Sequence, residues 1–188
     1  EITGRVRNTP GRILIPVFTD ENIDDILVRL VSNFRWELCR TMMGSAWNDI
    51  TQRSLTSEYT DYVQFYRKNR NLTEEAKNKL KSLISKHHNK LREIFTSDYE
   101  MWINYESKGN PRLNKVARAI LFRYCPFSKE TRDFLENQPM YIELINQMKI
   151  QKARQVKDLK NRYRHYLKAG NGLLDKALDD NLAFYRDN

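Results

Sequence analysis

Residues 139–168 read PMYIELINQMKIQKARQVKDLKNRYRHYLK, the longest stretch of uninterrupted helical pattern in the chain. Proline is tolerated at the first helical position, and glycines stand two and four residues after the stretch, where a helix is expected to end. Four apolar side chains recur at steps of three and four residues and define what we call the apolar seam: Val156, Leu159, Tyr163 and Tyr166. The stretch therefore predicts a single long amphipathic helix.

The same spacing appears between Thr19 and Gly44. Thr19 and Asp20 are typical of an N-cap, and the acidic residues that follow suit the positive end of a helix. Apolar side chains then recur at three- and four-residue steps over about six turns. These residues are Ile23, Ile26, Leu27, Leu30, Val31, Phe34, Leu38 and Met42. The pattern predicts one apolar face on a helix that Gly44 ends.

Capping residues and apolar spacing predict two helices in the centre of the chain. One opens at Thr56 or Ser57 and closes at the basic turn of residues 67–70. The next opens at Thr73, and its apolar positions continue as far as Phe95. Ser97 lies three residues before a glutamate, which is capping-box spacing, so a break at Thr96 and a short restarted helix are expected.

Three shorter helices are predicted around the long one. The first opens at Asn110 and Pro111 and runs to Tyr124, since asparagine favours the cap and proline the first helical position. The second runs from its cap at Ser128 to about residue 136. The third covers residues 173–185.

Composition supports a helical fold. The chain has 188 residues and a mass of 22.5 kDa, with only 6 glycines and 5 prolines, which disfavours turn-rich sandwiches and barrels. We predict an all-α fold, an irregular multi-helix bundle of about seven helices with an extended N-terminal arm. Residues 1–18 form the arm or linker, in which a lone strand would lack a partner, and residues 19–188 form a single helical domain. Because the chain opens with Glu1, we expect it to be a domain of a larger protein.

Several classes of protein are disfavoured by what the sequence lacks. No apolar run approaches the roughly 18 residues of a membrane helix, so no membrane span is expected. Two cysteines, Cys39 and Cys125, cannot make a disulfide framework, which favours an intracellular location, cytoplasmic or nuclear. Three histidines and two cysteines show no zinc-type spacing, so we expect no metal and no cofactor.

The net charge of +9 is concentrated in the middle of the chain. Residues 61–168 carry +12, whereas residues 19–60 carry −3. Within the predicted long helix, seven cations define what we call the basic face: Lys149, Lys152, Arg154, Lys157, Lys160, Arg164 and Lys168. This face could neutralise nucleic-acid phosphates or lie against an acidic protein or lipid surface. The alternative is a solvated face, paired within the chain with the acidic residues near Asp20 to Asp25 or with those near Asp179 and Asp180.

Aromatic residues gather in neighbouring predicted helices: Tyr59, Tyr62, Tyr66, Tyr99, Trp102 and Tyr105. Beside cations they can line a groove for a peptide or stack bases, or they can form the inner layer of a bundle. Trp47 follows the first helix and either covers its end or anchors a partner. Tyr66 and Trp47 are therefore the candidate aromatic anchors.

Catalytic motifs are not apparent. The chain has no glycine-rich phosphate loop, no nucleophile elbow and no His-Glu-x-x-His pair, so no catalytic residue is assigned. His165 beside Arg162 and Arg164 could serve a ribonuclease in outline, which keeps an enzyme as a third hypothesis. His87 is expected in the core and His88 at the surface.

The first hypothesis for function is a non-catalytic interaction module that holds a macromolecular partner through the basic face and an aromatic groove. The partner would be another protein or the remainder of the parent chain. The second hypothesis is direct binding of RNA or DNA by the basic face of residues 139–168.

Overall fold

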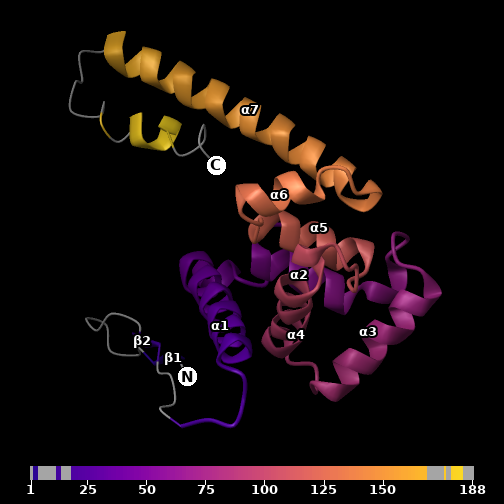
Figure 1. Cartoon of the computed structure of the whole chain (residues 1–188). Coiled ribbons are helices and arrows are strands. Elements are labelled where there is room, and N and C mark those ends of the chain that lie inside the picture. Colours follow the sequence, from indigo (N-terminus) through magenta and orange to yellow (C-terminus); the bar gives the residue numbers. More distant parts are fainter. Residues whose placement is uncertain (1, 4–11, 14–17, 169–175, 177–178, 184–188) are drawn as a thin grey trace. The chain divides into compact units, whose positions relative to one another are not determined.

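The computed structural model describes residues 2–3, 12–13, 18–168, 176 and 179–183, and within them it confirms the all-α class (Figure 1). The described residues form seven α-helices: α1 (Ile23–Met43), α2 (Leu55–Gln64), α3 (Glu74–Lys86), α4 (Leu91–Asn104), α5 (Lys115–Tyr124), α6 (Lys129–Leu135) and α7 (Pro139–Lys168). Three single-turn 3-10 helices, η1 (Gly44–Ala46), η2 (Tyr66–Lys68) and η3 (Glu106–Lys108), follow α1, α2 and α4. The long helix has the bounds that the sequence predicts.

The predicted arm of residues 1–18 lies largely outside the described residues. Its described segments Ile2–Thr3 (β1) and Arg12–Ile13 (β2) pair antiparallel, with Ile2 opposite Ile13. The expectation that a strand in this arm would lack a partner is therefore wrong, because two segments of the arm pair with each other. The predicted last helix is described only at residues 176 and 179–183, which are helical.

The chain divides into two compact units. Unit 1 covers Glu1–Pro126 and contains α1 to α5, and unit 2 covers Phe127–Asn188 and contains α6 and α7. In unit 1, α4 is the central helix and contacts α1, α2 and α5 (Figure 1). In unit 2, α6 contacts α7. The single helical domain over residues 19–188 stays a prediction.

Side-chain caps fix where most of these helices begin. Thr73 and Ser128 cap α3 and α6, as predicted. The predicted caps of the first two helices are wrong by two or three residues. Asn22 caps α1 by accepting a hydrogen bond from Asp24 N–H, and Ser54 caps α2 in a reciprocal capping box with Ser57. In both cases the cap lies where a side-chain oxygen can reach an unsatisfied backbone N–H.

The break between the third and fourth helices falls earlier than predicted. His88 and Asn89 have φ of 50° and 60°, in the left-handed region, and the Asn89 N–H donates to the Ile84 carbonyl to close the end of α3. Asparagine tolerates this conformation better than most residues. The predicted break at Thr96 is wrong, because residues 91–104 form one continuous helix in which Ser97 is an interior residue.

The predicted start of the next helix at Asn110 and Pro111 is also wrong. Glu106 is fully buried, and its Oε1 accepts hydrogen bonds of 2.7 Å from the backbone N–H groups of Arg112 and Leu113. These bonds hold the segment outside a helix, so α5 begins only after Asn114, whose side chain accepts from the N–H groups of residues 116 and 117. The buried Glu106 carboxylate thus places the start of α5 later than Pro111 suggested.

The core of unit 1 is rich in aromatic rings. Trp36, Tyr59 and Phe95 meet with centroids 5.2–6.3 Å apart, and Tyr59 also contacts Tyr62 edge to face. Trp102 is fully buried and donates from Nε1 to the carbonyl of Cys125 at 3.0 Å. Such pairs stabilise a core beyond the area that they bury. The aromatic residues of α2 and α4 therefore hold unit 1 together.

Candidate interaction surfaces

The basic face of α7 is presented to solvent. Of its seven cations, six are exposed and Lys152 is half-buried. The apolar seam on the same helix is half-buried. At 1.5 Å per residue, a helix of 30 residues is about 45 Å long. The structure therefore brings the predicted basic residues together along one extended helix, with an apolar seam beside them.

Unit 2 also contains a cavity of about 770 Å³ between α7 and the helical residues 179–183. Its apolar lining includes Val156 from the seam and Leu182 from the opposite wall. Charged side chains of both signs surround this lining: Lys149, Lys152, Lys160, Asp179 and Asp180. Three of the predicted basic residues thus lie at an apolar hollow, an arrangement that the sequence pattern did not reveal because its second wall comes from a distant segment.

The predicted aromatic groove is not formed by the residues proposed for it. Tyr59, Tyr62, Tyr99 and Trp102 are buried in unit 1, whereas Tyr105 is 43% exposed. Tyr66 is also buried, at 9% exposure, and the Arg67 guanidinium lies 5.7 Å from the centroid of its ring. These aromatics correspond to the alternative interpretation, an inner layer of the bundle.

Trp47 lies in the turn after α1 and is half-buried. Its ring meets Trp36 edge to face with centroids 6.3 Å apart. This contact matches the interpretation of Trp47 as a cover over a helix end. Because Trp47 is only half-buried, its predicted role as an anchor stays a prediction.

An exposed apolar surface on α1 was not predicted from the sequence. The predicted apolar face of the first helix is divided: Ile26 and Leu30 are buried, and six others are 38–77% exposed. We call these six the outer face of α1: Ile23, Leu27, Val31, Phe34, Leu38 and Met42. A polar side chain packs inward instead. Ser32 is fully buried and donates a hydrogen bond to Thr96 of α4 at 3.0 Å.

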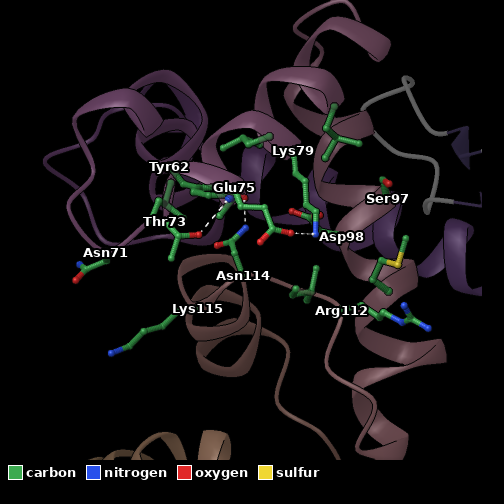
Figure 2. Close-up of a pocket in the computed structure, with 16 residues that line it drawn as sticks. Tyr62, Asn71, Thr73, Glu75, Lys79, Ser97, Asp98, Arg112, Asn114 and Lys115 are labelled. Atoms are coloured by element: carbon green, nitrogen blue, oxygen red, sulfur yellow. Dashed lines mark hydrogen bonds and ion pairs between the residues drawn. The ribbon is translucent and has the colours of Figure 1, made fainter.

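A second cavity, of about 390 Å³, opens in unit 1 (Figure 2). It is lined by Tyr62 of α2, by α3, α4 and the residues before α3, and by the residues that lead into α5, so that charged and polar side chains alternate with leucines. Lys79 pairs with Glu75 at its edge, with Nζ 2.7 Å from Oε1, and Asn114 donates to the Tyr62 hydroxyl at 2.7 Å. Asp98 also lines this cavity while remaining buried. Because these groups pair with one another, we assign the polar side chains of this cavity a structural role in unit 1.

Asp98 has an unusual titration. Burial raises the pKa of its carboxyl from 3.8 to about 7, although the hydrogen bond from the Tyr59 hydroxyl, 2.8 Å long, favours the charged form. The folded chain then binds this proton more tightly than the unfolded chain does between pH 4 and pH 7. The contribution of Asp98 to stability is therefore greatest at acidic pH and declines as pH rises through this window.

We expect Asp98→Asn to remove this pH dependence. Asparagine keeps an acceptor for Tyr59 and carries no charge, so the variant should be more stable than the natural chain above pH 7, by up to a few kcal/mol. At pH 4 the two should be nearly equal. Urea unfolding at pH 4, 5.5 and 7.5 measures the difference, with exposed Asp61→Asn as the control. Parallel pH profiles for Asp98→Asn and the natural chain would contradict the assignment.

The histidines and cysteines offer no assembled catalytic group. His87 is half-buried and its Nε2 is buried without a hydrogen-bond partner, whereas His88 is exposed, as predicted. His165 is exposed and meets Tyr166 edge to face. Cys39 and Cys125 are free, and burial raises the pKa of the Cys125 thiol to about 11, which makes it a poor nucleophile.

Comparison with protein families gives one result. The family model described as "Domain of unknown function (DUF8509)" matches residues 44–185, three quarters of the chain. The chain belongs to the DUF8509 family. The match begins at Gly44, the residue that ends α1, and it includes α2 to α7. No curated protein and no solved structure matches this DUF8509 chain.

Within the described residues, no helix combines the length and apolar character that crossing a bilayer requires. Even α7, the longest of them, carries charged residues along its whole exposed side. This agrees with the absence of an apolar run in the sequence.

Proposed function

We propose that this DUF8509 chain is a non-catalytic helical interaction module that binds an acidic protein segment through the basic face of α7. The observation that supports this most directly is the cavity beside that face. Its lining is apolar, and Lys149, Lys152 and Lys160 surround it. A partner helix with an apolar stripe and acidic flanks would place the stripe in the cavity and its carboxylates against the lysines.

The cations of α7 alone would suit a nucleic acid as well as an acidic protein segment. The apolar lining of the cavity therefore decides between these two partners. Phosphates require cations but no hollow lined by Ala153, Val156 and Leu182. A protein partner uses both the cations and the apolar hollow, because apolar contacts supply most of the affinity and exposed ion pairs contribute only about 0.2–1 kcal/mol each. The protein segment, from another chain or from the remainder of the parent protein, is therefore the first proposal.

In this proposal the apolar part of the binding surface is the cavity of unit 2, and the predicted aromatic groove is abandoned. Tyr66 and the aromatic residues of α2 and α4 are occupied in the core of unit 1. We place the module in a reducing compartment, cytoplasmic or nuclear, because both cysteines are free thiols.

Binding of RNA or DNA is the second candidate. It is favoured by the number of exposed cations on α7, with Arg154, Lys157, Arg164 and Lys168 stepping along one side of the helix. Such a surface would give an affinity that falls steeply with salt, with a slope of about 0.7–0.9 per phosphate neutralised.

The test is reversal of Lys149, Lys152 and Lys160, the three lysines at the cavity, to glutamate in the full chain. The probes are a synthetic amphipathic peptide with glutamates flanking a leucine stripe and mixed-sequence RNA and DNA oligonucleotides, each followed by fluorescence anisotropy. We expect the natural chain to bind the peptide at physiological salt and the triple variant to bind it at least about tenfold more weakly, since three ion pairs become repulsive. Little binding to either oligonucleotide is expected.

The matched control reverses three exposed lysines of unit 1, Lys68, Lys81 and Lys108, and should leave peptide binding almost unchanged. Tight, salt-sensitive binding to RNA or DNA that the α7 reversal abolishes would replace the first proposal by the second. Equal weakening by both triple variants would show that net charge, and not the basic face of α7, controls binding.

A further inference from the structure

The outer face of α1 is not part of the surface proposed above. It consists of Ile23, Leu27, Val31, Phe34, Leu38 and Met42, which are 38–77% exposed. At about 100° per residue these side chains lie on one side of α1, roughly opposite Ser32 and Trp36, which are buried. Single exposed apolar residues are common, but a continuous apolar stripe along a helix of 21 residues indicates an interaction site.

The order of residues in this stripe is symmetric. Its spacings are 4, 4, 3, 4 and 4, the same in both directions, about a centre between Ser32 and Asn33. If a second α1 is laid antiparallel across this centre, Val31 faces Phe34, Leu27 faces Leu38, and Ile23 faces Met42. Every apolar residue of one copy thus meets an apolar residue of the other, which is the self-complementarity that a twofold interface requires.

The charges on α1 favour the same orientation. The first turn of α1 carries Asp24 and Asp25, and its last turn carries Arg40, which also pairs with Glu37 of the same helix. Antiparallel packing places the acidic start of one copy near the basic end of the other and aligns the helix dipoles favourably. Parallel packing would bring the acidic starts together.

We propose that this chain forms an antiparallel homodimer through the outer face of α1. The central spacings of the stripe alternate between four and three residues, the alternation at which side chains of two helices interlock. The surface lies outside the region that matches the family, which begins at Gly44. The occupant is a second copy of this chain, because an antiparallel copy matches both the symmetric spacing and the charge polarity of α1.

The first measurement is the mass of the full chain in solution between about 1 and about 200 µM, by sedimentation or light scattering. We expect a dimer with a dissociation constant in the micromolar range. Val31→Glu and Phe34→Lys, made separately, should each weaken dimerisation at least about 100-fold, because each places two unpaired charges in one symmetric interface. Both positions are exposed, so helix content should stay unchanged, and so should the thermal midpoint measured below the dissociation constant, where the natural chain is also a monomer.

Mixing the two variants tests the orientation. In the antiparallel dimer residue 31 of one copy faces residue 34 of the other, so a mixture of Val31→Glu and Phe34→Lys chains should form a heterodimer in which the two new charges pair. The matched control is Phe134→Glu on α6, a residue that is 61% exposed and should leave the dimer intact.

A natural chain that remains a monomer at the highest concentration would overturn the proposal. So would a dimer that both charged variants leave intact, or variants that stay monomeric when mixed. None of these measurements uses the acidic peptide, so dimerisation can fail while binding by α7 succeeds, and the reverse.

Discussion

Replacing Glu106 by alanine is expected to lower the free energy of unfolding by about 3–5 kcal/mol and the thermal midpoint by about 10 °C or more. Glu106 is fully buried, and Arg118, which is 8% exposed, donates to it from Nε at 2.6 Å and from Nη2 at 3.0 Å. The same carboxylate accepts the backbone N–H groups of Arg112 and Leu113. Its removal leaves a buried guanidinium without its counter-charge and two backbone donors without their acceptor.

The effect can be followed selectively. All three tryptophans of the chain lie in unit 1, so the unfolding of this unit can be measured by tryptophan fluorescence in urea. Glu106→Gln, which keeps an acceptor, should lose less stability than Glu106→Ala. Combining Glu106→Gln with Arg118→Met should cost less than the two single changes added together, because no unpaired charge remains buried. Full additivity would contradict the assignment of this pair as one coupled unit.

Trp102→Ala is expected to have a similar effect, a loss of about 3–5 kcal/mol. The Trp102 side chain is fully buried, meets Phe122 edge to face with centroids 6.2 Å apart, and donates to the Cys125 carbonyl. Alanine would leave a large cavity in unit 1 and remove the donor from a carbonyl near the end of α5. The measurement is again urea unfolding, followed here by far-ultraviolet circular dichroism because the variant removes a fluorophore.

Trp102→Phe separates the two contributions. Phenylalanine fills much of the volume but cannot donate, so its stability should lie between those of the natural chain and Trp102→Ala. Trp47→Phe is the control, since Trp47 is only half-buried and should lose far less. If Trp102→Ala and the control lose the same amount, Trp102 is not the packing centre that its burial indicates.

These stability variants and the binding variants act on different residues. Glu106 and Trp102 lie inside unit 1, whereas the outer face of α1 and the basic face of α7 are exposed. Substitutions on the two exposed surfaces should therefore change association without changing the unfolding of unit 1 measured on the monomer. A variant that changes both would indicate that its effect on binding comes from a damaged fold.

The long helix and the helical class could be predicted from the sequence because both depend on local information. Pro139 fixes the start of α7, and the repeated steps of three and four residues define its sides without reference to the rest of the chain. The cations of its basic face were predicted for the same reason, since an exposed side of a helix needs no tertiary partner.

Other boundaries depended on contacts between distant residues and could not be read locally. Glu106 accepts hydrogen bonds from the two backbone N–H groups that precede Asn114. For this reason α5 begins after Asn114 and not at Pro111, where the sequence predicted its start. The cavity of unit 2 needs Val156 and Leu182, which lie 26 positions apart in the sequence.

The two faces of α1 show most clearly what the sequence determined and what tertiary structure decided. Spacing alone established that α1 is a helix with an apolar side. It could not establish which side packs inward, because Ser32 and Trp36 bury against other helices while Val31 and Phe34 stay exposed. Burial is a property of the neighbours that a side chain meets, and α4, which carries Thr96 to meet Ser32, begins 48 residues after α1 ends.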